Sequence, residues 1–174
     1  MTQYKYNFKK FFKSVEKGMS ITDDQFVTNG HFIVKKEYLR KPQKDFIESE
    51  KEGLFAETKN TEQYIKTLYK VLDDARRTSY IEDSTEFVPV YLGTEIDKAT
   101  SEKFKVVMTE DYMCIKEEYY NFIKDIKGKI FYYPKLPVYT GLPIYKNNEM
   151  IGLIFGVKPC NAISDKAKYK EVAS

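Results

Sequence analysis

Residues 112–159 read YMCIKEEYYNFIKDIKGKIFYYPKLPVYTGLPIYKNNEMIGLIFGVKP, and this stretch decides which fold the chain can adopt. Apolar side chains recur at helical spacing over residues 116–127, and Gly128 stands where a helix C-terminus favours glycine. Runs of β-branched and aromatic residues follow, spaced by prolines, and the pair Asn147-Asn148 turns the last hairpin. A helix followed by short strands that return on themselves predicts an α+β fold with a mostly antiparallel sheet.

The segment 27–39, VTNGHFIVKKEYL, predicts a second hairpin further upstream. Asn29 and Gly30 are residues that a type I′ turn favours, since both tolerate positive φ angles, and apolar β-branched residues flank them. His31, the only histidine of the chain, directly follows this turn. Because the sequence supplies no evident triad or metal set around it, we interpret His31 as a structural or surface residue, with a catalytic role as the alternative.

Two more segments have the periodicity of helices. Residues 61–75 and residues 4–17 each carry apolar side chains on one face, which predicts a middle helix and a basic N-terminal helix. Residues 78–109 between them and the C-terminal helix are strand-like, and Pro89 marks an edge or a bulge there. We therefore expect three main helices beside the sheet.

The length of 174 residues predicts a single α+β domain over residues 1–159, followed by a polar C-terminal tail over 160–174. No apolar stretch approaches the length of about 18 residues that a membrane span needs. Lysines occupy the N-terminus where a signal peptide would be apolar, so we expect a cytoplasmic protein in its host cell. Cys114 and Cys160 lack the spacing of a zinc site, and we expect reduced core residues, no metal and no cofactor.

The sequence contains no glycine-rich phosphate loop, no GxSxG or HExxH motif and no dinucleotide-binding fingerprint. Glu57–Lys59 has the E-x-K form found in metal-dependent nucleases, although this tripeptide is common in a lysine-rich chain. Of the 29 basic residues 26 are lysine, a profile typical of AT-rich coding sequences. That profile also weakens the case for base reading in DNA, which relies on arginine.

The strongest electrostatic feature is a row of lysines on the predicted N-terminal helix. The candidate binding residues are Lys9, Lys10, Lys13 and Lys17. Such a row favours contact with phosphates or with an acidic partner surface, and it would make binding dependent on salt. The alternative is an ordinary solvated helix face.

Two segments resemble parts of the bacterial DNA sliding clamps, the processivity rings of polymerases. The helix written kYLldaLk in that family is matched by Tyr119, Tyr120, Phe122 and Ile123, and its closing strand is matched by IGLIFGVK. The clamp segment ATDGhrLa is similar to VTNGHFIVK, with Thr28, Gly30 and His31 matching. The resemblance covers about a third of the chain, and it implies a clamp-like half-domain at the C-terminal end, of the kind that phages and mobile elements reuse.

These observations lead to three hypotheses about function. The first is a non-enzymatic phage or mobile-element interaction protein that acts on host nucleic-acid machinery, such as an anti-CRISPR or another nuclease inhibitor. The second is a clamp-like DNA-associating or processivity factor that assembles from several copies. The third is a metal-dependent nuclease. The first hypothesis predicts a host protein of nucleic-acid metabolism or defence as partner, with nucleic-acid contact through the basic helix as a further option.

Overall fold

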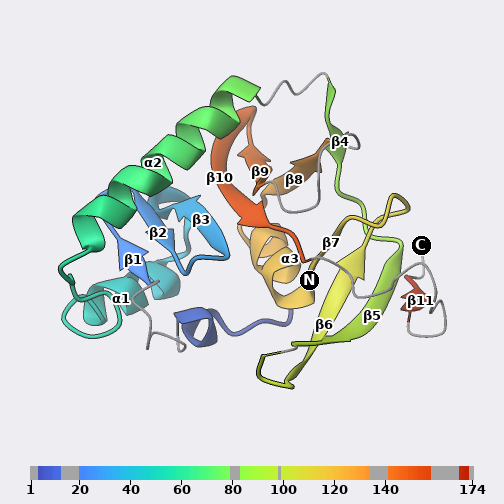
Figure 1. Cartoon of the computed structure of the whole chain (residues 1–174), viewed down its shortest axis with the longest axis horizontal. Helices are drawn as coiled ribbons and strands as arrows, with labels where there is room; N and C mark the ends of the chain where they lie inside the picture. The colour runs from blue at the N-terminus through green and yellow to red at the C-terminus, as the bar shows by residue number, and fades with distance from the viewer. Residues whose placement is uncertain are drawn as a thin grey trace.

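The computed structural model describes residues 4–12, 20–78, 83–97, 99–133, 141–157 and 169–172. It confirms the predicted α+β class, with helices packed on sheets whose described strands all pair antiparallel (Figure 1). No helix among the described residues is long and apolar enough to cross a membrane.

The helices are α1 (Lys41–Ser49), α2 (Thr61–Thr78) and α3 (Glu117–Asp125), with the 3-10 helices η1 (Phe8–Phe12) and η3 (Lys36–Tyr38). The first strands are β1 (Ile21–Thr22), β2 (Phe26–Thr28), β3 (Phe32–Lys35), β4 (Thr85–Glu86), β5 (Tyr91–Ile96) and β6 (Lys103–Met108). The remaining strands are β7 (Cys114–Lys116), β8 (Lys129–Tyr132), β9 (Gly141–Lys146), β10 (Glu149–Phe155) and β11 (Tyr169–Glu171). The predicted middle and C-terminal helices are thereby confirmed as α2 and α3.

The strands form two sheets. The larger has the order β1-β2-β3-β10-β9-β8-β4, and the smaller has the order β11-β5-β6-β7. Strand β10, the most apolar run of the chain, lies between β3 and β9 and so joins the N-terminal hairpin to the C-terminal one. On β9, Tyr145 and Ile144 pair with β8. The pairing stops at the next residue toward the N-terminus, Pro143, which has no N–H group to donate.

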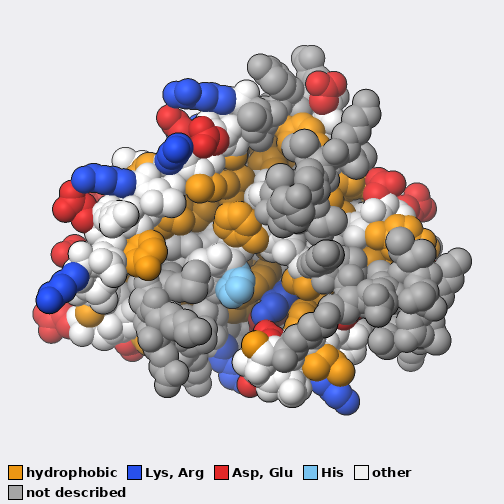
Figure 2. Space-filling view, in the orientation of Figure 1, with side chains coloured by type: hydrophobic (Ala, Val, Ile, Leu, Met, Phe, Trp, Pro, Cys, Tyr) orange, Lys and Arg blue, Asp and Glu red, His pale blue; other side chains and the backbone are white. Residues whose placement is uncertain are grey.

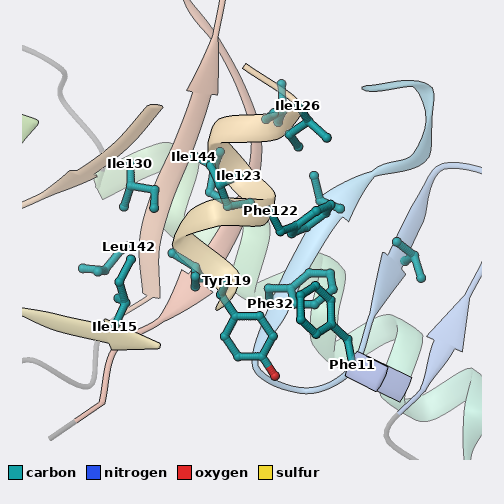
Figure 3. Close-up of a cluster of buried hydrophobic side chains, with 14 of the residues drawn as sticks. Phe11, Phe32, Ile115, Tyr119, Phe122, Ile123, Ile126, Ile130, Leu142 and Ile144 are labelled. Carbon is teal, nitrogen blue, oxygen red and sulfur yellow. The ribbon is translucent and has the colours of Figure 1, made fainter. Parts of the chain in front are cut away.

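Helices cover both faces of the larger sheet. On one face α2 packs through Leu72 against Phe26, Ile33 and neighbouring side chains of the sheet. On the other face lie α3 and η1, whose rings form the main core with Phe32 (Figure 3). Helix α3 also contacts β6 and β7, so it lies against both sheets, and the largest buried cluster contains residues of both.

The predicted N-terminal α-helix is wrong for the residues that the structure describes. Residues 4–7 are not helical, and Phe8–Phe12 form a single 3-10 helix. The physical reason is packing, since Phe8, Phe11 and Phe12 are all buried and the backbone follows the sites that these three rings occupy. The rest of the predicted helix, residues 13–17, lies outside the described residues.

The hairpin over residues 26–35 is confirmed, but its turn is not type I′. Thr28 pairs with Ile33, which leaves a four-residue loop, and only Gly30 has a positive φ angle there, 83°. The Asn29 side chain turns inward instead, where its Oδ1 accepts the N–H groups of His31 and Phe32. In the last hairpin, both Asn147 and Asn148 have positive φ angles, as a type I′ turn requires.

Part of the predicted C-terminal tail, residues 169–171, is a strand in the structure. These residues form β11, which pairs antiparallel with β5 at the edge of the smaller sheet. An edge strand is held by its backbone hydrogen bonds, and a polar sequence such as Tyr-Lys-Glu therefore gives little sign of it.

Candidate functional site: two grooves beside the N-terminal turn

Three buried phenylalanines fix the η1 helix in place. The ring centroids of Phe8 and Phe11 lie 5.4 and 5.7 Å from that of Phe122 on α3. Phe12 is fully buried, and its ring lies 6.0 Å from that of Phe32 on β3. The backbone of η1 is therefore a rigid platform, and its lysines project from a fixed position.

Lys9 and Lys10 line two different grooves. Lys9 lines a groove of about 850 Å³, which we call the Arg40 groove. Its lining residues are Tyr4, Tyr6, Asn7, Phe8, Lys9, Arg40, Pro42, Gln43, Phe46 and Asp125. Lys10 lines a second groove of about 490 Å³, which we call the Lys116 groove. Its lining residues are Lys5, Lys10, Asp97, Glu102, Lys103, Phe104, Lys105, Lys116, Glu117 and Glu118.

The predicted row of four lysines is thus divided in the described structure. Successive side chains of a 3-10 helix diverge by about 120°. Accordingly Lys9 leans over Phe46, with its Nζ 5.6 Å from the ring centroid, while Lys10 lies in the other groove. Lys13 and Lys17 lie outside the described residues.

A polar network forms one wall of the Arg40 groove. The Arg40 Nη1 lies 3.1 Å from the Asp125 Oδ1. The Tyr6 hydroxyl donates a hydrogen bond to Asp125 and accepts one of 2.7 Å from the Gln43 Nε2. These side chains come from the N-terminal segment, the start of α1 and the end of α3, so the network ties together three distant parts of the sequence.

The network joins a neutral phenol, that of Tyr6, and a largely buried carboxylate, that of Asp125, to an exposed cation, the guanidinium of Arg40. Burial, and then the Asp125 carboxylate that accepts its hydrogen bond, raise the pKa of Tyr6, so the phenol stays protonated and remains a donor. The Asp125 side chain is only 13% exposed, whereas that of Arg40 is 61% exposed. Among the described residues, Arg40 contacts Asp125 through Nη1 alone, which leaves the other N–H groups of its guanidinium available to a ligand.

The Lys116 groove is of mixed charge, with five lysines and four acidic residues. The Lys116 Nζ lies 4.8 Å from the Phe104 ring centroid, a cation–π contact that holds the ammonium in place. Asp97 already accepts the backbone N–H groups of Ala99 and Thr100, which lowers its pKa. The near balance of charge gives this groove a weak preference for anions.

His31 lies on the surface, on the loop between β2 and β3 (Figure 2). Its ring stacks beside that of Tyr119, with centroids 6.1 Å apart. Partial desolvation by its neighbours and the charge of Lys116 lower the pKa of His31, which favours the neutral imidazole at pH 7. His31 is exposed and lines neither groove.

Sequence analysis did not single out Arg40, Gln43 or Asp125. One signal was present, because Arg40 is the N-cap of α1, where the helix dipole disfavours a cation. An arginine at that position therefore needs a partner from elsewhere in the fold. The partner, Asp125, lies far away in the sequence, and no local pattern connects the two.

Other residues that the sequence suggested lie elsewhere. Glu57 and Lys59 are both exposed on the connection between α1 and α2 and line neither groove. Cys114 is buried and unpaired, and burial raises its pKa to about 12. Within the described residues, no group of three or more His, Cys, Asp or Glu side chains is placed to hold a metal ion.

Comparisons of the chain with protein-family models, with curated proteins and with solved structures found no match in any of the three.

Proposed function

We propose that the protein is a non-enzymatic interaction protein that acts on host nucleic-acid machinery, as a nuclease inhibitor carried by a phage or a mobile element. The observation that carries the proposal is the Arg40 groove, a surface depression of about 850 Å³ on a platform fixed by buried rings. Tyrosine, phenylalanine and arginine are enriched where proteins bind one another, and tyrosine and arginine often supply most of the binding energy.

The hydrogen bonds of the groove support binding without reorganisation. Tyr6, Gln43 and Asp125 already hold one another, so their side chains lose little conformational freedom when a partner arrives. Preorganisation of this kind raises affinity because binding then costs less entropy. The net charge of +3 opposes entry into a basic nucleic-acid cleft, so the proposed contact lies on another surface of the nuclease.

A cleavage assay tests this proposal. The purified protein is added in increasing molar ratio to a restriction or CRISPR-associated nuclease from a phage-sensitive host, with labelled DNA as substrate. We expect cleavage to stop near a stoichiometric ratio, with a complex of the two proteins on gel filtration. Unchanged cleavage at a large molar excess over every nuclease of such a host would overturn the proposal.

The same preparation separates the other two hypotheses. A ring-sized oligomer that is retained on circular DNA would favour the clamp-like factor. Cleavage of the DNA by the protein alone, dependent on added Mg²⁺ or Mn²⁺, would favour the nuclease. Either result, in the absence of inhibition, counts against the inhibitor.

A further inference from the structure

We infer that the Arg40 groove is a docking site for an acidic segment of a polypeptide partner, in which Arg40 binds a carboxylate and the adjacent rings contact apolar residues. This inference rests on the proposed function and specifies the chemistry of the partner.

Charge at the groove surface is the first argument. Its charged lining residues are Lys9, Arg40 and Asp125. Asp125 is largely buried, pairs with Arg40 and accepts a hydrogen bond from the Tyr6 hydroxyl, whereas Arg40 and Lys9 are exposed, so the charges at the surface of the groove are positive. The planar guanidinium matches a carboxylate in geometry, and such charge-assisted bonds are among the strongest in proteins.

Apolar surface beside these cations is the second argument. Pro42 and Phe46 project from α1 into the same groove, and Phe46 is partly exposed. The Lys9 ammonium lies over the Phe46 ring, so cation and aromatic surface adjoin. A segment that alternates acidic and apolar residues matches this surface better than a uniformly acidic one.

The arrangement of the rings argues against a nucleic acid as occupant. Single strands bind through aromatic faces on which bases stack, together with a track of cations along the backbone. Here one face of the Tyr6 ring stacks on Phe11 at 5.9 Å, and Phe8 is buried against other rings, so neither ring offers both faces to a base. Two cations are also too few to follow several phosphates.

Fluorescence anisotropy tests the inference on the full chain. The probe is a fluorescein-labelled peptide of about ten residues that alternates glutamate and leucine. A lysine–leucine peptide controls for charge, and a labelled oligothymidine serves as the nucleic-acid probe. We expect only the acidic peptide to bind. Arg40→Gln should weaken its affinity at least tenfold, since the variant removes both the positive charge and the paired N–H groups that bind a carboxylate.

Two further variants keep the test independent of folding. Lys9→Gln changes an exposed side chain and should weaken binding severalfold. Lys66→Gln, on the exposed face of α2, removes an equal charge outside the groove and should leave affinity unchanged. Unchanged affinity of both Arg40→Gln and Lys9→Gln would overturn the inference, as would tighter binding of the oligothymidine than of the acidic peptide.

The nuclease assay then separates this inference from the proposed function. If the wild type inhibits cleavage and Arg40→Gln inhibits equally well, the inhibitor stands and the docking site is wrong. If the acidic peptide binds in an Arg40-dependent manner while no nuclease is inhibited, the docking site stands and the inhibitor is wrong.

Discussion

At the scale of the residue, Asn29 connects three parts of the core. Its Nδ2 donates to the Phe11 carbonyl and to the Tyr119 hydroxyl, both at 3.0 Å, while its Oδ1 accepts two backbone N–H groups of the loop. The side chain is buried, so water cannot replace these bonds without entering the core. Asn29 therefore holds η1 and α3 to the β2–β3 loop.

Replacing Asn29 with alanine should cost on the order of 3 kcal/mol of stability, because it leaves several buried polar groups without partners. Urea denaturation measures the loss. His31→Ala is the matched control. His31 lies two residues further along the same loop, its ring is exposed, and its loss should change the free energy of unfolding by no more than about 0.5 kcal/mol. Equal midpoints for the wild type and the Asn29 variant would show that the loop holds without this side chain.

Tyr119 predicts how stability depends on pH. Burial raises its pKa from 10.0 to about 12. In the unfolded chain the phenol loses its proton near the lower value, so its contribution is complete below pH 10 and is lost as the pH rises toward 12. Denaturation midpoints measured across this range should fall, and Tyr119→Phe should make the fall less steep. Tyr64→Phe, at an exposed tyrosine of α2, is the control for the loss of a phenol hydroxyl as such.

At the scale of the element, Gly152 sets how closely β10 approaches β3. A Cβ atom at this position would lie 2.0 Å from the Ile33 carbonyl oxygen and 2.9 Å from the Val34 Cα. Both are backbone atoms of the neighbouring strand and cannot move aside alone. The two strands must separate to admit any larger residue.

Gly152→Ala should therefore destabilise the protein by about 3 kcal/mol or more, since overpacking here displaces a central ladder. Thermal unfolding followed by circular dichroism gives the shift in Tm. Gly53→Ala offers a control, because its new Cβ would meet a movable carboxylate oxygen of Glu50. A Tm for Gly152→Ala within two degrees of the control would contradict the close approach.

Sequence patterns located most of the elements that have their own local signal. The helix predicted over 61–75 extends to Thr78, and the turn at Asn147-Asn148 has the backbone angles that two asparagines favour. The prediction of an α-helix in the N-terminal segment is wrong, because the spacing of its aromatic residues indicates which side chains are buried and not which type of helix forms. Phe8, Phe11 and Phe12 are buried as that spacing suggested, but they occupy sites that α3 and β3 create.

At the scale of the whole molecule, Phe122 lies in the core that both sheets share. Its side chain is fully buried, and it belongs to one cluster with Phe32 of the larger sheet and Ile115 of the smaller (Figure 3). Because the sheets share this core, we expect them to unfold as one unit.

Phe122→Ala should lower stability by about 3–5 kcal/mol through the cavity it leaves. Hydrogen exchange of the amides in β3 and in β6 should accelerate together. Val88→Ala, whose side chain is 59% exposed, should change neither rate. Faster exchange in β3 with unchanged exchange in β6 would mean that the smaller sheet is stable alone.

The candidate site depends on the fold of the whole molecule, because its residues are far apart in the sequence. The lysines of the N-terminal segment were visible in the sequence, and so was the abundance of aromatic residues. The Arg40 groove, in contrast, requires Tyr6, Gln43 and Asp125 to meet, and their hydrogen bonds span up to 119 positions. Contacts at such separation follow from the packing of α3 against η1, which no local pattern encodes.

The place of β10 in the larger sheet bears on how the protein is made. Strand β3 ends at Lys35, while its partner β10 begins only at Glu149, so a ribosome releases the first long before the second. Throughout that interval the edge of β3 that later pairs with β10 is open, and other nascent chains can pair with it. This edge carries Phe32, Ile33 and Val34, which are all buried in the folded protein. We expect the growing chain to depend on chaperones until β10 emerges, and the Arg40 groove to form only after Asp125 on α3 has emerged.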